Sequence, residues 1–99
     1  MMTDKTQEQT FASVWDALED SPAEAANMRL RSDLMIALQE VVAGWGLTQA
    51  EAAQRLDVTQ PRLNDLLRGR IGKFSLDALI VLAGRAGLEV RMEVAHAAA

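Results

Sequence analysis

The residues from Thr48 to Gly69, TQAEAAQRLDVTQPRLNDLLRG, are the segment that most constrains how this chain can fold. Thr48 and Thr59 each precede a short helical pattern, where a threonine hydroxyl can accept a hydrogen bond from a free N–H of the first turn. Glu51 follows Thr48 at the spacing of a capping box. These signals predict two short helices joined by a turn of about three residues.

Both predicted helices have an apolar side and a polar side. The apolar residues at helical spacing are Ala52, Ala53, Leu56, Leu63, Leu66 and Leu67. The second helix projects Gln60, Arg62 and Asn64 outward, and these side-chain types can pair with base edges in the major groove. The pattern is a helix-turn-helix, which makes double-stranded DNA the first partner to consider. A helical hairpin with no DNA-binding role is the alternative.

This segment resembles the Xre/Cro-type helix-turn-helix family, which includes the lambdoid phage repressors. The matching residues are Thr48-Gln49, Ala53, Val58, Thr59-Gln60, Leu63 and Gly69. Asp57 departs from the family pattern, in which glycine is common in the turn, although Asp tolerates positive φ better than most residues. The resemblance implies an all-α, lambda-repressor-like bundle in which Gln49 contacts a phosphate and braces the next helix.

The surrounding sequence is similar to the HigA-type antitoxin branch of that family. The similar stretches are FASVWDAL at 11–18, Gln60-Pro61-Arg62, Arg68-Gly69-Arg70 and Phe74-Ser75-Leu76-Asp77. This resemblance covers roughly residues 11–94. It implies a transcriptional repressor that controls its own operon and neutralises an RNase toxin encoded beside it.

The expected DNA-contacting residues fall into two groups. The groove-facing group is Thr59, Gln60, Arg62 and Asn64. The phosphate-contacting group, at the point where the chain leaves the second helix, is Arg68, Arg70 and Lys73. A solvated charge cluster is the alternative for the second group. Asp65 is expected to pair with Arg62 or Arg68 rather than to contact a base.

The charge of the chain is unevenly distributed. The formal net charge is −4, yet residues 55–73 contain five Lys and Arg against two Asp, whereas residues 1–27 contain one Lys against six Asp and Glu. A local basic face can bind phosphates on an acidic protein. The acidic N-terminal segment is the candidate toxin surface, since an RNase toxin carries basic RNA-binding groups. The acidic total also leaves open a protein-interaction module that does not bind DNA.

Three further helices are expected, which makes about five. The first has a stripe of Phe11, Val14, Trp15 and Leu18. The second starts at the Ser21 cap and runs to about Ala43, with its buried side formed by Leu30, Leu34, Leu38, Val41, Val42 and Trp45. The last is capped by Ser75 and runs to Ala86, with Gly87 as its terminator.

Residues 88–94 change from helical to alternating periodicity, which predicts a β-strand. A lone strand leaves its backbone groups unpaired, and the sequence offers no second strand. The same strand of another copy is therefore the expected partner, across a two-fold axis. The predicted dimerisation residues are Leu88, Val90, Met92 and Val94.

Several functional classes are not expected. The chain has no cysteine, and His96 has no ligand partner nearby in sequence, so neither a metal nor a cofactor is predicted. Nucleophile motifs and glycine-rich phosphate loops are also missing, so the chain is not expected to be an enzyme. With no signal peptide and no membrane span, a cytoplasmic location is expected. The predicted organisation is a disordered tail at 1–9, a single domain at 10–94 and a flexible tail at 95–99.

Overall fold

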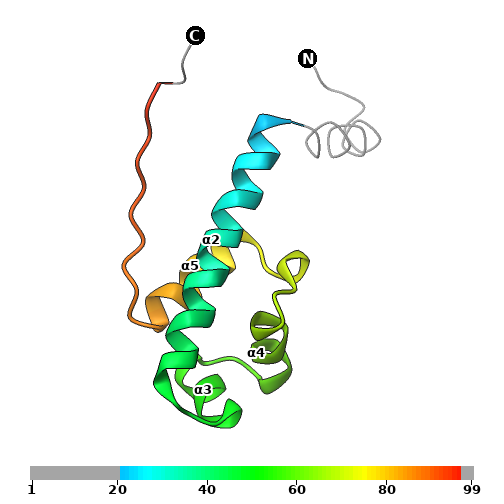
Figure 1. Cartoon of the computed structure of the whole chain (residues 1–99), viewed down its shortest axis with the longest axis vertical. Coiled ribbons are helices and arrows are strands. Elements are labelled where there is room, and N and C mark those ends of the chain that lie inside the picture. Colours follow the sequence, from blue (N-terminus) through cyan, green and yellow to red (C-terminus); the bar gives the residue numbers. More distant parts are fainter. Residues whose placement is uncertain (1–20, 97–99) are drawn as a thin grey trace.

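The computed structural model describes residues 21–96. Its elements are α2 (Pro22–Trp45), α3 (Gln49–Leu56), α4 (Gln60–Leu67), the 3₁₀ helix η1 (Ile71–Lys73) and α5 (Leu76–Arg85). Figure 1 shows α2 as a long rod, with α3, α4 and α5 gathered around its C-terminal half. The described part of the chain is therefore helical, as the sequence predicts.

Helix α2 begins and ends through local signals. The Ser21 hydroxyl accepts a hydrogen bond of 3.1 Å from the backbone N–H of Glu24, and Pro22 occupies the first helical position. Gly46 ends the helix in the left-handed conformation, with φ of 66°. The helix continues past the predicted end at Ala43 because Gly44 is accommodated within it.

One hydrophobic core joins the four helices. Its largest fully buried side chains are Leu38, Leu56, Leu63, Leu66, Phe74 and Leu79. On α2 the buried positions start only at Met35. Leu30, which was predicted to be buried, has half of its surface exposed because the smaller helices cover only the later turns of α2.

Of two further expected features, one lies outside residues 21–96 and the other is not found within them. The predicted helix with the Phe11–Leu18 stripe lies outside the described residues, so four α-helices are described rather than about five. The predicted strand at 88–94 is not found in the single chain: these residues have no regular secondary structure. They run back beside α2 as an extended segment, here named the C-terminal arm (residues 88–96; Figure 1). A strand needs a hydrogen-bonding partner, and the described part of the chain supplies none.

Candidate nucleic-acid interface

The turn between α3 and α4 is built from backbone and cap hydrogen bonds. Thr48 and Glu51 form the predicted capping box, with bonds of 3.0 and 3.2 Å. Asp57 ends α3 in the left-handed conformation at φ 58° and ψ 48°. The Thr59 hydroxyl then accepts a bond of 3.2 Å from the backbone N–H of Arg62. These contacts set the direction in which α4 leaves the turn.

Arg85, on α5, is far from this turn in sequence but contacts it directly. Its Nη1 donates to the carbonyl oxygens of Leu56 and Asp57 at 3.2 and 3.3 Å. These are carbonyls at the end of α3, where a cation also interacts favourably with the helix dipole. Sequence reasoning missed this role because Arg85 is far along the chain and belongs to no local motif.

Gln39 on α2 holds the other end of α4. Its side-chain amide donates to the carbonyl oxygens of Leu66 and Leu67 at 2.9 and 3.5 Å. The last carbonyls of a helix have no partner within it, so this contact acts as a C-cap supplied from another helix. Sequence reasoning also missed Gln39, since its only local signal is a polar residue on an otherwise apolar helix face.

The outward surface of α4 forms one side of an open depression. Its lining residues are Gln49, Gln60, Pro61, Asn64, Asp65, Arg68 and Arg70. The structure thus brings together five of the eight predicted DNA-contacting residues, from the start of α3, along α4 and into the loop beyond it. The hydroxyl of Thr59 is nearby but is already used as the α4 cap.

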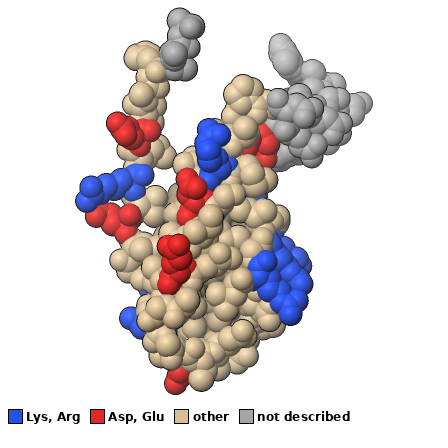
Figure 2. Space-filling view, viewed as in Figure 1, with Lys and Arg blue, Asp and Glu red and all other residues tan. Residues whose placement is uncertain are grey.

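Positive charge gathers beside this depression. Figure 2 shows a cluster of Lys and Arg side chains over the segment that follows α4, while the acidic side chains visible in that view lie elsewhere. Arg68, Arg70 and Lys73 are all exposed. Arg70 pairs with Asp65 at 3.3 Å, so the partner of Asp65 differs from the predicted Arg62 or Arg68. A cation held in this way keeps a defined position beside α4.

Arg62 points away from the depression. Its guanidinium carbon lies 4.0 Å from the centre of the Phe74 ring, and its Nη1 donates to the carbonyl of Lys73 at 2.7 Å. Arg62 and Lys73 therefore meet at the edge of the surface rather than inside the depression. Both are residues of the predicted DNA-contacting set.

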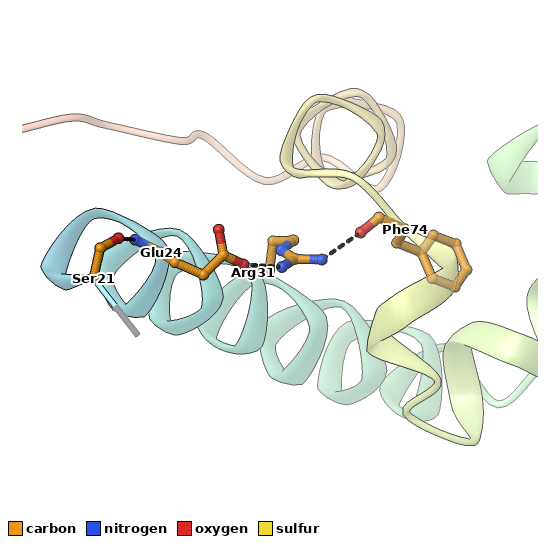
Figure 3. Close-up of polar contacts among 4 residues, drawn as sticks. All are labelled: Ser21, Glu24, Arg31 and Phe74. Carbon is orange, nitrogen blue, oxygen red and sulfur yellow. Dashed lines mark hydrogen bonds and ion pairs between the residues drawn. The ribbon is translucent and has the colours of Figure 1, made fainter. Parts of the chain in front are cut away.

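A second arginine reaches the same loop from α2. Figure 3 shows Arg31 between Glu24 and Phe74, with Glu24 beside the Ser21 cap. The Arg31 guanidinium lies 3.5 Å from the Glu24 carboxylate and donates to the Phe74 carbonyl at 3.4 Å. Phe74, which is 1% exposed, is thus contacted by arginines from two helices.

Two further features were looked for in residues 21–96, a metal site and a membrane-spanning helix. This part of the chain has no group of three or more His, Cys, Asp or Glu side chains placed to hold a metal ion. Among the described helices, none is long and apolar enough to cross a membrane.

Comparison with protein families matches residues 17–95 to a model of a helix-turn-helix domain. The chain belongs to this helix-turn-helix family. Comparison with curated proteins finds no match. Membership of this family indicates a DNA-binding regulator, and the family is a regulatory fold rather than a typical enzyme fold.

Proposed function

We propose that this helix-turn-helix protein is a sequence-specific transcriptional repressor that places α4 in the major groove of duplex DNA. The observation that carries the proposal is the shared open face of Gln49, Gln60, Asn64, Arg68 and Arg70. An α-helix fits the major groove, and amide side chains at its exposed face can pair with adenine. Buried Leu63 and Leu66 fix the opposite side of α4 in the core.

The residues divide by chemistry into two roles. Gln60 and Asn64 supply amide groups for base edges, while Arg68, Arg70 and Lys73 supply positive charge for phosphates. Gln49 lies at the exposed start of α3, where its side chain could donate to a DNA phosphate. Thr59 caps α4 and, in this arrangement, would lie at the edge of the DNA major groove.

Fluorescence anisotropy with the duplex upstream of the chain's own gene tests this division. Gln60→Ala is expected to cost about 1–3 kcal/mol of binding free energy and to relax base preference at one position. Arg68→Ala should weaken all duplexes alike and lower the salt slope by about 1. The matched controls are Gln54→Ala and Arg29→Ala, which change exposed residues outside the depression.

The same assay separates the proposal from its rival. The rival is a protein-interaction module with a helix-turn-helix fold that does not bind DNA, and the net charge of −4 is its support. Absence of any duplex binding above background at low salt would reject the repressor proposal and favour that rival.

We also propose that the protein acts as a homodimer. Leu30, Ile80, Val90, Met92 and Val94 are exposed apolar residues that line a groove between α2, α5 and the C-terminal arm. A second copy would cover this surface and supply a partner for the predicted strand. Two copies would also present two α4 helices to half-sites about 34 Å apart on DNA.

An antitoxin role is the finer proposal, and it rests on the similarity to HigA-type sequences. Its further support is the acidic segment before α2, whose charge complements a basic RNase. Deletion of residues 1–20 should weaken the complex with a neighbouring RNase more than it weakens DNA binding. Equal RNase affinity after the deletion would exclude this surface, and failure of any neighbouring gene product to bind would leave a simple repressor.

A further inference from the structure

The Arg62 side chain is already engaged in the free protein. It leaves the first turn of α4, covers the face of the buried Phe74 ring at 4.0 Å and donates to the Lys73 carbonyl at 2.7 Å. Attraction between a guanidinium and a ring face adds to the charge-assisted hydrogen bond. Reading a base edge would require Arg62 to give up both contacts.

The segment that Arg62 contacts carries the predicted phosphate-binding cations. Backbone hydrogen bonds tie its start to α4: Gly69 donates to Leu66 at 3.1 Å and Arg70 to Asp65 at 3.0 Å. Further along, Lys73 donates to Arg70 at 3.0 Å and Phe74 to Ile71 at 3.2 Å. These two later bonds lie within the loop and do not join Lys73 to α4 directly. Arg62 joins the α4 side of the interface to the end of this loop, and Arg31 joins α2 to the next carbonyl.

Asp65 already holds Arg70 beside α4. From this geometry we infer that Arg62 is a positioning residue, which sets Lys73 at phosphate distance from α4 and does not read a base. The inference rests on the proposed DNA-binding function and changes the role of one residue within it. Lysine cannot replace Arg62 fully. An ammonium lacks the planar guanidinium that can cover a ring and donate to a carbonyl at the same time. Phe74 serves as the buried anchor for this contact.

The first test uses the free protein. Hydrogen exchange by NMR at the backbone amides of Lys73 and Phe74 should be faster in Arg62→Ala than in wild type, while amides of α3 keep their protection. Gln60→Ala is the matched control, because it alters an exposed residue of the same helix turn whose side chain makes no hydrogen bond to the loop. Unchanged exchange at both loop amides in Arg62→Ala would overturn the inference.

The second test uses a duplex that wild-type protein selects from a pool of random sequence, together with all its single-base-pair variants. Arg62→Ala should weaken selected and random duplexes by the same factor, keep the preference order among variants, and lower the salt slope by about 1, as loss of one phosphate contact does. Arg62→Ala combined with Lys73→Ala should lose less than the product of the two single losses. Loss of preference at one base pair, with random duplex unaffected, would overturn the inference.

A third variant guards against general loss of folding. Phe74→Leu retains an apolar core residue and the Arg62 guanidinium but removes the ring beneath it, so it should reproduce the uniform loss of affinity. Unaltered binding by a folded Phe74→Leu would contradict the positioning role. If the random pool yields no enriched duplex, the proposed function fails, and the exchange experiment alone still decides whether Arg62 places the loop.

Discussion

Asp57 shows how one residue sets the path of the chain between α3 and α4. It takes φ 58° and ψ 48°, and it is the one non-glycine residue with positive φ in residues 21–96. This conformation brings a side chain close to the following carbonyl, which Asp and Asn tolerate better than other non-glycine residues. The ion pair between the Arg85 guanidinium and the Asp57 carboxylate is long, at 4.0 Å, and exposed, so it adds little to stability.

The effect of a substitution at Asp57 on the free energy of unfolding therefore depends on how well the new residue adopts positive φ. Asp57→Ala is expected to lower the free energy of unfolding by about 1 kcal/mol, since alanine lacks the polar group that eases this conformation. Asp57→Gly should cause no such loss, because glycine adopts positive φ freely. Urea unfolding followed by circular dichroism measures both. A glycine variant less stable than the alanine variant would contradict this explanation.

Helix α4 illustrates how a short element depends on its surroundings. Eight residues are too few for a helix to be stable alone in water. Thr59 caps its start, Gln39 caps its end from α2, and Leu63 and Leu66 anchor it in the core. The outward side chains of Gln60 and Asn64 are therefore not needed to hold the helix in place.

Removal of the Gln39 contact should loosen α4 from its C-terminal end. Gln39→Ala is expected to reduce unfolding free energy by about 1 kcal/mol, the net value of a typical hydrogen bond. Gln39→Glu should cost more, because an anion would face the negative end of the helix dipole. Hydrogen exchange at the α4 amides reports the local effect, with Gln54→Ala as the exposed control. Equal stability of the two Gln39 variants would argue against the cap.

At the scale of the whole molecule, apolar surface is left uncovered on the side of the C-terminal arm. Met92 and Val94 are 82% and 84% exposed, and they face the groove lined by α2 and α5. Glu89, Arg91 and Glu93 alternate with the apolar residues of the arm. In an antiparallel pair of arms this alternation allows opposite charges to lie across from each other.

Variants of the arm test the proposed dimer. Met92→Asp places a charge on the apolar face, and Val90→Pro removes a backbone donor from the strand pairing. Both should convert a wild-type dimer to monomer or aggregate in sedimentation at micromolar concentration. Ile36→Asp, at an exposed apolar site away from the groove, should leave the dimer intact. A monomeric wild type, or dimers in both arm variants, would remove the basis for a two-fold symmetric operator.

The sequence alone determined the features that depend on neighbouring residues. The caps at Ser21, Thr48, Thr59 and Ser75 mark the helix starts, and the apolar spacing of α3 and α4 specifies which sides are buried. Each of these signals acts within one or two helical turns, so local chemistry is sufficient to predict it.

Only the tertiary structure decided how distant side chains are used. Three side chains donate to loop or helix carbonyls 27 to 43 positions away in sequence: those of Gln39, Arg31 and Arg85. No periodic pattern in the sequence predicts such contacts. Arg62 has the chemistry of a base-reading residue, yet packing places an aromatic ring and a carbonyl within its reach. The arm was expected as a strand from its alternation, but a strand also requires a partner backbone, and residues 21–96 do not supply one.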